Sequence, residues 1–395
     1  MSLYICRAIF FNLETYSHKI FNSTAQLPLA WEALAVQNIF LSRSYLKVLE
    51  IAAPHNMSCH FIAFFQEEQL IGIAVAQFLD LNQLESFGER DHNIKTSVRN
   101  FIFKHFASHV LFLGNNMLTG QNALYFLPEI PNKKALQLVK SAINNIKKYY
   151  RNQHKKIHLI SIKDFDSTEI QNFQKAGFTK EYIFSTQPNM IFTIPSHWST
   201  EEDYIMALQK KYRDQYKRAR KKAMGIEKQK MSLEDIIHHE KTIYNLYFHV
   251  AKNAPFNTFF LTENHFRTLK EQLKDNFLFY GYFLNNQLIG FNTLIKNGNV
   301  IDTYFLGYDD TIQKEKMLYL NMLYDMISYS IKKQFKSIVF ARTALEIKSS
   351  VGAKPLVMYG LLEHSNVLIH SKIGKIFNYL EPKTVWQQRH PFKEL

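Results

Sequence analysis

The clearest pattern of hydrophobic and polar residues lies in the second half of the chain. Residues 277–284 and 287–295 are rich in aromatic and β-branched residues, and Asn285-Asn286 separates them. A two-residue connection of this kind is typical of a tight β-hairpin, so we expect the two segments to pair antiparallel. Residues 300–307 continue the pattern and predict a third strand.

A change of period follows this third strand. Over residues 317–331 the apolar residues recur at spacings of three and four, which predicts a helix with one apolar stripe. Residues 337–341 then return to a short apolar run, as expected of a buried strand. The order of hairpin, strand, helix and strand predicts a mixed sheet with one parallel crossover.

The first half of the chain repeats this order. The sequence Gln-Leu-Ile-Gly occurs at residues 69–72 and again at 287–290, 218 residues later, each time after an aromatic strand and a short polar turn. The first copy is followed by a strand at 110–114, a helix at 134–150 and a strand at 156–162. We therefore interpret the chain as two copies of one structural unit.

The remaining segments complete the two copies. The first copy contains an insertion between Leu81 and His109 and ends with a short helix and a last hairpin; the second opens with a basic helix and two further helices. The further elements expected are helical pieces over 31–52, strands at 60–65 and 69–78, a helix at 169–178, hairpin strands within 181–194, and helices at 201–224, 233–253 and 262–275.

These elements predict an α+β protein of two tandem domains. We place the first domain at residues 1–198 and the second at 199–395, each with a mixed, mostly antiparallel sheet flanked by helices. A length of 395 residues agrees with two domains, since a single core stops growing well below this size. The hydrophobic fraction of 46% is sufficient to fill two cores.

Composition excludes several functional classes. The thirteen glycines are never closer than six residues apart, so neither a Rossmann G-x-G-x-x-G nor a P-loop motif occurs. There is no H-E-x-x-H motif, and Cys6 and Cys59 cannot form a thiolate zinc site, so we expect no metal. Two cysteines and no apolar run of about 20 residues indicate a cytoplasmic protein without a membrane span.

The formal charge of +14 is concentrated in one segment. Residues 207–230 hold ten lysines and arginines against Asp214 and Glu227, an excess of eight that is more than half of the total. Packed by its narrow apolar stripe, this helix presents a cationic ridge suited to an anionic ligand. The alternative is an ordinary solvated surface helix.

Two segments resemble a known superfamily. The residues from Phe340 to Gly352 and the basic run from Leu208 to Lys222 resemble tandem members of the GNAT acyltransferases, namely the Fem-type aminoacyltransferases and their acetyltransferase-like relatives. The resemblance implies acyl or aminoacyl transfer from a thioester or ester to an amine bound in the groove between the domains. It also implies that the basic helix borders this groove and binds a nucleotide-sugar phosphate or a tRNA backbone.

The resemblance also suggests the residues of the site. Asp302 and Tyr304 are the predicted catalytic residues, because they lie two apart on one face of a strand; the alternative for Asp302 is a solvated acid at a strand edge. Arg342 is the predicted anion clamp, unless it pairs structurally with Glu346. The predicted substrate-binding residues are Arg342, Glu346, Lys348, Tyr308, Arg213 and Lys217.

The predicted donor is an acyl-coenzyme A, with the binding domain left open. In the second domain Gln313, Lys314 and Lys316 stand where other acetyltransferases carry a glycine-containing pyrophosphate loop, and we expect a helix N-terminus there to receive phosphate. In the first domain a loop from Gly114 to Gly120 occupies the corresponding position.

Two other functions fit the same sequence. One is a Fem-type aminoacyltransferase that uses charged tRNA and acts on a peptidoglycan precursor. The other is a non-catalytic module that binds RNA or another anion through the basic helix. The short helices at 233–253 and 262–275, interrupted by Pro255, favour the acetyltransferase-like branch over one with a long tRNA-binding arm. The oligomeric state is left open.

Overall fold

The structure of the protein is a computed structural model, and it describes residues 15–83, 106–185, 187–254, 257–380 and 386–393. Structural statements below refer to this part of the chain. Most of the predicted insertion of the first copy, residues 84–105, lies outside the described residues.

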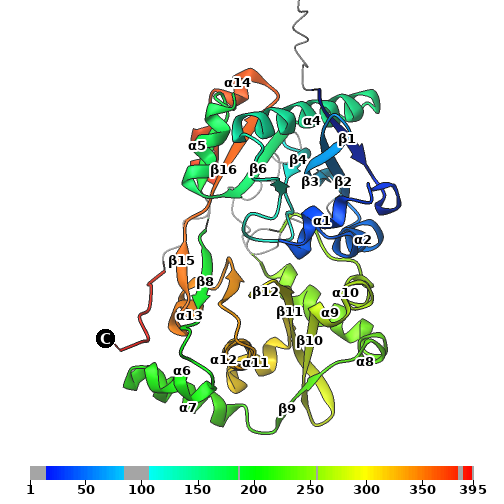
Figure 1. Ribbon diagram of the computed structural model, residues 1–395. Helices are drawn as coiled ribbons and strands as arrows, with labels where there is room; N and C mark the ends of the chain where they lie inside the picture. Colours follow the sequence, from blue (N-terminus) through cyan, green and yellow to red (C-terminus); the bar gives the residue numbers. More distant parts are fainter. Residues whose placement is uncertain (1–14, 84–105, 186, 255–256, 381–385, 394–395) are drawn as a thin grey trace, which may run out of the picture.

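Two eight-stranded sheets form the framework (Figure 1). The first sheet has the order β1-β2-β3-β4-β6-β16-β7, with β5 paired to β3. Its strands are β1 (Tyr16–Phe21), β2 (Met57–Gln66), β3 (Gln69–Asp80), β4 (His109–Leu113), β5 (Leu124–Phe126), β6 (Leu159–Phe165), β7 (Tyr182–Ser185) and β16 (Tyr359–His364).

The second sheet repeats this arrangement. Its order is β15-β8-β14-β12-β11-β10-β9, with β13 paired to β11. Its strands are β8 (Asn189–Thr193), β9 (Ile226–Lys230), β10 (Phe277–Leu284), β11 (Gln287–Asn297), β12 (Val300–Thr303), β13 (Gly307–Tyr308), β14 (Ser337–Ala341) and β15 (Lys354–Leu356). The predicted mixed and mostly antiparallel sheets are confirmed.

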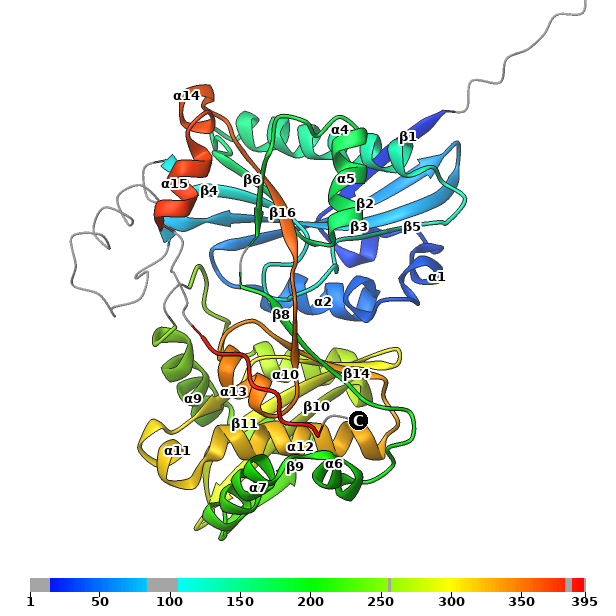
Figure 2. The ribbon, with the colours of Figure 1, turned by 90° about the vertical axis from the view of Figure 1, so that its left-hand side faces the viewer.

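Helices cover the outer faces of both sheets and fill the space between them (Figures 1 and 2). The first unit is the first sheet with α1 (Trp31–Ala35), α2 (Arg43–Ala52), α4 (Asn132–Asn152), α5 (Ser167–Lys175), α14 (Val367–His370), α15 (Ile373–Leu380) and the 3₁₀ turns η1 (Thr24–Gln26), η2 (Ile39–Leu41) and η3 (Leu81–Gln83). The second unit is the second sheet with α6 (Glu201–Ala207), α7 (Lys210–Lys222), α8 (Leu233–His238), α9 (Glu240–Lys252), α10 (His265–Leu273), α11 (Asp310–Lys316), α12 (Leu318–Lys332), α13 (Leu345–Ser350) and η4 (Lys274–Asn276).

Three hydrophobic cores hold these layers together. One lies between the first sheet and α4 and α5, and another between the second sheet and α6, α7 and α12. The third core combines residues of both units, for example Tyr45 and Leu49 of α2 with Phe266 and Leu269 of α10. Because the two units share this core, burial of apolar surface fixes their relative position.

Strand register confirms the internal repeat. Phe64 pairs with Gly72, and Tyr282 pairs with Gly290, so the two hairpins match at the offset of 218 that the sequence predicts. Both glycines are required by close approach: a Cβ atom on Gly72 would lie 2.4 Å from the Phe126 ring, and one on Gly290 would lie 3.1 Å from the Gly307 carbonyl oxygen. The repeated Gln-Leu-Ile-Gly thus marks where β5 and β13 join their sheets.

Each unit also contains a parallel pair of strands that separates after a few residues. The β4–β6 ladder ends at Leu113 and Ile162, and the β12–β14 ladder ends at Asp302 and Val339. Beyond these points the chain turns to β5 or β13, which pair on the far side with β3 or β11. Each sheet therefore opens between its two parallel strands. The opening lies where the chain leaves the first of these strands and continues to α4 in the first unit and to α12 in the second.

The strand next to one edge of each sheet comes from the other half of the chain. We expected both strands within 181–194 to close the first copy, but β7 joins the first sheet whereas β8 lies between β14 and β15 in the second. In return β16 lies between β6 and β7. A division of the chain at residue 198 would leave one strand of each sheet in the opposite half.

The basic segment forms two helices where one was expected. The chain leaves the helical conformation at Leu208 (φ −68°, ψ 144°), because Leu208 forms a β-bridge with Phe392 and the Gln209 amide donates to the Pro391 carbonyl. α6 and α7 therefore meet at an angle set by the C-terminal segment. In the described parts of the chain no helix is sufficiently long and apolar to cross a membrane.

The strand exchange makes a testable prediction at Gly360 of β16. A Cβ atom there would lie 2.5 Å from the Phe184 ring and 2.7 Å from the Ile162 carbonyl oxygen. We expect Gly360→Val to lower the free energy of unfolding by about 1–3 kcal/mol. Hydrogen exchange should accelerate in β6 and β7, about 200 residues away in sequence.

Gly298→Asn is the control for this prediction. Gly298 has φ +58°, a conformation that asparagine adopts readily, and no heavy atom lies within 4 Å of a Cβ at this position. Its stability should change by less than about 0.5 kcal/mol. Unchanged exchange in β6 and β7 of Gly360→Val would contradict the strand order described here.

Candidate functional site

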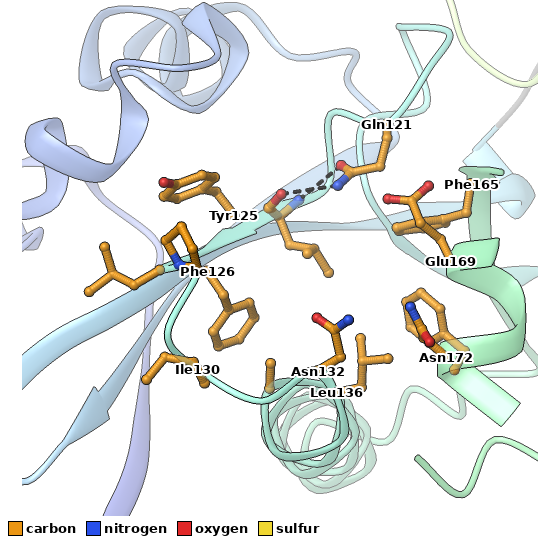
Figure 3. Close-up of a pocket in the computed structure, with 14 residues that line it drawn as sticks. Gln121, Tyr125, Phe126, Ile130, Asn132, Leu136, Phe165, Glu169 and Asn172 are labelled. Atoms are coloured by element: carbon orange, nitrogen blue, oxygen red, sulfur yellow. Dashed lines mark hydrogen bonds between the residues drawn. The ribbon is translucent and has the colours of Figure 1, made fainter. Parts of the chain in front are cut away.

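The first unit contains a cleft at the point where its central strands separate (Figure 3). It encloses about 210 Å³ and lies between β5, the start of α4 and α5. Its lining consists of Gln121, Leu124, Tyr125, Phe126, Leu127, Pro128, Ile130, Asn132, Ala135, Leu136, Phe165, Glu169, Asn172 and Phe173. Most of these side chains are apolar, so the cleft can enclose an extended ligand with a few polar groups.

The polar groups of the cleft come from two helices. Asn132, Glu169 and Asn172 point into it, the first from the N-terminus of α4 and the others from α5 (Figure 3). Burial raises the pKa of Glu169, whose side chain also completes a capping box with Asp166 at the start of α5. Gln121 shapes the entry to β5: its Oε1 accepts from the Ala123 amide at 2.9 Å, and its Nε2 donates to the Leu124 carbonyl at 3.2 Å.

The N-terminus of α4 faces the same cleft without a capping side chain. The residue before the helix is Pro131, which makes no side-chain cap, and its carbonyl accepts from the amides of Lys134 and Ala135. Lys133 in the first turn is exposed. The free amides and the dipole of this 21-residue helix favour an anionic group at this end of the cleft.

In the second unit, side chains of α6 and α7 connect the elements that correspond to α4 and α5. Gln215 of α7 donates to the Tyr324 hydroxyl of α12 at 3.2 Å and to the Ser350 hydroxyl of α13 at 3.3 Å. The Tyr204 hydroxyl of α6 donates to the Val351 carbonyl at 3.1 Å. Gln215 thus bridges α12 and α13, and Tyr204 connects α6 to the end of α13. The counterparts of α12 and α13 in the first unit, α4 and α5, flank the open cleft. The two copies are thus not equivalent as binding sites.

The residues predicted to bind phosphate in the second unit lie within a helix. Gln313, Lys314 and Lys316 belong to α11, and the Gln313 amide donates to the Asp309 carbonyl. The helix expected over 317–331 begins at Leu318 after Met317, whose left-handed conformation (φ 50°) separates it from α11. The turn before α12 therefore differs from the phosphate-receiving helix start that the sequence suggested.

Arg342 lies at the seam, by which we mean the zone where residues of the second unit contact residues of the first. Its guanidinium forms an ion pair with Asp164 of β6 and donates from Nε to the Gln187 carbonyl at 3.0 Å. Asp164 is buried and is also paired with Lys163 at 2.7 Å. In the matched β6 and β14 ladders Asp164 and Arg342 hold equivalent positions, 178 residues apart. The ion pair therefore joins corresponding positions of the two copies.

Asp302 ends the parallel ladder of the second unit and is buried, with 7% of its surface exposed. Its Oδ2 atom has no hydrogen-bond partner among the described residues. Burial raises the pKa of this carboxyl group to about 7, and a hydrogen bond from Asn297 opposes the shift. The predicted alternative of a solvated strand-edge acid does not agree with this burial.

A chain of amides connects Asp302 with the first unit. Asn297 donates to Asn38 at 3.5 Å, and Asn38 donates to Asn122 at 2.9 Å. Asn122 follows Gln121, which lines the cleft. The amide of Ile39 also donates to Asn297 at 3.0 Å. Polar contacts thus run from the cleft of the first unit to the buried acid of the second.

Tyr304 belongs to the second unit, as Asp302 does, and its hydroxyl forms a hydrogen bond with His265. The His265 Nδ1 atom is 2.7 Å from the Ala52 carbonyl, so it carries the proton, and Nε2 accepts from the Tyr304 hydroxyl at 3.0 Å. Burial lowers the pKa of His265 to about 4, which keeps the ring neutral. This arrangement links α10 of the second unit to α2 of the first and gives Tyr304 a structural role in addition to any chemical one.

The other predicted residues of the second unit are held by partners within that unit. Glu346 pairs with Arg389 in the C-terminal segment, so the expected alternative of an Arg342–Glu346 pair is wrong. Lys348 is buried, which lowers its pKa to about 7, and its Nζ donates to the carbonyls of Phe340 (2.6 Å) and Arg342 (2.7 Å). Tyr308 belongs to β13, where it pairs with Gly290.

Arg213 and Lys217 lie on α7, which packs against α6, α11 and α12. This helix is at the end of the second unit remote from the first sheet (Figures 1 and 2). The expectation that the basic helix borders the groove between the units is therefore wrong. Among the described residues no group of three or more histidine, cysteine or acidic side chains is arranged to hold a metal ion.

Comparisons with known proteins agree with this architecture. No family model and no curated protein matches the sequence. Among solved structures, that of FemX aligns with a TM-score of 0.52 and 10% sequence identity over 92% of this chain and 100% of FemX. A tandem GNAT protein from the clavulanic acid biosynthesis pathway aligns with a TM-score of 0.51 and 7% identity over 89% of this chain and 99% of that one.

The chain has a tandem GNAT fold that resembles Fem-type proteins. At these identities the likeness shows the fold, and the sites must be argued from the residues themselves. In GNAT terms the cleft of the first unit is the gap between the splayed central strands, and α4 is the helix that follows it.

The polar residues of the seam were missed in the sequence because nothing distinguishes Asn38, Asn122 and Asn297 from other asparagines of this chain. A signal for the cleft residues was present in the repeat. Extending the match of the two GNAT units beyond Gln-Leu-Ile-Gly to their second crossover strands would have aligned Asp164 with Arg342 and brought α5 into consideration.

The ion pair at the seam makes a prediction about stability. Arg342→Ala leaves Asp164 buried with Lys163 as its remaining partner, so we expect a loss of about 1–3 kcal/mol in the free energy of unfolding, measured with urea. The loss should stay below the about 3–5 kcal/mol typical of a buried charge left without any partner. Arg218→Ala, in an exposed position on α7, should change stability by less than about 0.5 kcal/mol. Equal effects of the two substitutions would contradict the structural pairing.

Proposed function

We propose that the protein is an N-acyltransferase that binds an acyl-coenzyme A in the cleft of the first unit and transfers the acyl group to an amine held at the seam. The observation that carries this proposal is the asymmetry of the two copies. The cleft between α4 and α5 is open, whereas Gln215 and Tyr204 bridge the equivalent region of the second unit.

The shape and charge of the cleft suit a thioester donor of this kind. Its walls are apolar and would enclose an extended chain, and the uncapped N-terminus of α4 beside Lys133 would receive phosphate groups. Where β4 and β6 separate, main-chain groups that would otherwise complete the ladder become available to an amide-containing ligand. The ligand would thus replace part of the missing strand pairing.

Asp302 is the proposed general base. An amine attacks as its neutral form, its nitrogen bonds to the acyl carbon, and the carbon–sulfur bond breaks to release the thiolate of coenzyme A. The proton lost by the amine passes to the Asp302 carboxylate and from there to the thiolate, which leaves as the free thiol and restores the base. A pKa of about 7 suits this role, because such a carboxylate is ionised near neutral pH and is still a sufficiently strong base. The amide chain from Asn297 to Asn122 would orient the acceptor between Asp302 and the cleft.

Two observations favour coenzyme A over charged tRNA as the acyl carrier. The helices α8, α9 and α10 pack against the core shared by the two units and form no projecting arm among the described residues. The basic helix α7 lies at the remote end of the second unit, away from the cleft (Figure 1). A tRNA-dependent reaction on a peptidoglycan precursor remains the second candidate, and strict dependence on charged tRNA would identify it.

The proposed base predicts a pH dependence. Once the ligand retained by the purified protein has been identified by mass spectrometry, thiol release can be followed with that donor and acceptor. The rate should rise as pH increases through about 7, since the base must be ionised. Asp302→Asn should lower kcat by about 100-fold or more and remove this limb of the profile. Asp214→Asn, on the exposed face of α7, is the control.

Stability distinguishes catalysis from a structural role of Asp302. Because the folded pKa is raised above its ordinary value of 3.8, the folded protein binds more protons than the unfolded chain between about pH 4 and 7. Stability contributed by the protonated group is therefore lost as pH rises through this range. Asp302→Asn should be at least as stable as the parent at pH 8, and an inactive variant that is less stable there would argue against the proposed base.

The donor site is tested at Asn172. Asn172→Trp places a large side chain in the cleft and should weaken binding of acetyl-coenzyme A at least tenfold in calorimetry, because the ring fills space that the donor needs. Gln171→Trp is the matched control, since Gln171 is the preceding residue of α5, is exposed and does not line the cleft. Equal affinities of both variants and the parent would place the donor outside this cleft.

A further inference from the structure

The outer face of α7 forms a continuous cationic surface. The helix buries Tyr212 and Ala219, and the opposite side carries its exposed basic residues with Asp214 as the acidic residue among them. This cationic face consists of Lys210, Lys211, Lys217, Arg218, Lys221 and Lys222. Positions 210, 217 and 221 follow one line along the helix, and 211, 218 and 222 follow a neighbouring line.

One basic residue of α7, Arg220, anchors the helix to the second unit and does not belong to the cationic face. Arg220 points inward and pairs with Glu201 of α6 at 2.8 Å and with Asp325 of α12 at 2.7 Å. Its guanidinium also lies over the rings of Tyr216 and Tyr324. The helix is therefore held rigidly on the second unit, and the outward lysines and Arg218 are not needed to hold it there.

Large apolar side chains are exposed at both ends of the cationic face. Met206, in the last turn of α6, is 65% exposed, and Met224, directly after α7, is 71% exposed. Both helices lie at the end of the molecule remote from the first sheet (Figures 1 and 2). Two flexible apolar side chains thus flank six cations on an accessible end of the molecule.

We propose that this end of the second unit docks on the surface of an anionic lipid bilayer. The lysines and arginine would contact acidic headgroups, while Met206 and Met224 would enter the boundary between headgroups and acyl chains. Charge and apolar contact are two separate signals, and stable peripheral binding needs both. The inference is independent of the acyl transfer proposed above.

The same surface is less suited to RNA. Single-stranded RNA is bound largely by stacking of bases on exposed aromatic side chains. Both tyrosines of α7 are turned inward: Tyr212 is buried, and Tyr216 lies edge-on to Tyr324 at 4.9 Å between ring centroids. Exposed methionines add nothing to phosphate contacts, but they add apolar contact at a membrane.

The test is co-sedimentation of the full-length protein with vesicles of phosphatidylcholine alone or mixed with phosphatidylglycerol. We expect binding to the mixed vesicles, weakened by salt. Each cation near an anionic surface contributes a factor of about five to partitioning. Lys217→Ala with Lys221→Ala should therefore lower partitioning by about 25-fold.

Controls with the same chemistry lie on the first unit. Lys148→Ala with Arg151→Ala removes two exposed charges from α4, at the opposite end of the molecule, and should leave partitioning within about twofold of the parent. Met206→Gln with Met224→Gln should weaken vesicle binding at least threefold, whereas Val367→Gln with Leu368→Gln, two exposed positions of α14, should not.

Two results would overturn the proposal. The first is absence of binding to phosphatidylglycerol vesicles at low salt. The second is vesicle binding that depends on the lysines but not on the methionines, together with RNA binding in gel shifts that shows the same dependence. That outcome would identify a general polyanion surface.

Discussion

The exchange of one strand between the two halves is the constraint on which the rest of the structure depends. Buried main-chain groups must form hydrogen bonds, and β7 and β15 reach their sheets through strands supplied by the other half. The exchange and the shared middle core together leave the units little freedom to rotate or separate. The Arg342–Asp164 pair adds a further contact between the units, so the openings of the two sheets are held in a fixed relative position.

Within this symmetric frame the copies have diverged in what surrounds their openings. The second unit carries α6 and α7, anchored through Arg220, and uses them to bridge α12 and α13. The first unit has an open cleft in the corresponding place. The second unit instead contributes the buried acid Asp302. The residue of the first sheet that corresponds to Asp302 by strand register is Phe112. A cleft from one copy and a buried acid from the other would together form the proposed composite site.

Much of the fold was predictable because it depends on local patterns. The alternation of apolar residues gave both hairpins, the three-and-four spacing gave α4 and α12, and Gln-Leu-Ile-Gly gave the correct register between copies. The destination of β8 was not predictable, since both sheets offer the same kind of strand edge. The break at Leu208 and the partner of Arg342 depend on segments more than 150 residues away, which local periodicity does not report. The burial of Asp302 is likewise a property of the seam.

The position of β16 has a consequence for folding of the protein during its synthesis. This strand begins at Tyr359, long after β6 and β7 have been made, so the first sheet lacks one strand while most of the second is synthesised. Until then β6 and β7 offer bare edges to any neighbouring chain, a state that invites aggregation. The native topology thus ties completion of the earliest-made sheet to a strand that is made late, after the strands of the second sheet.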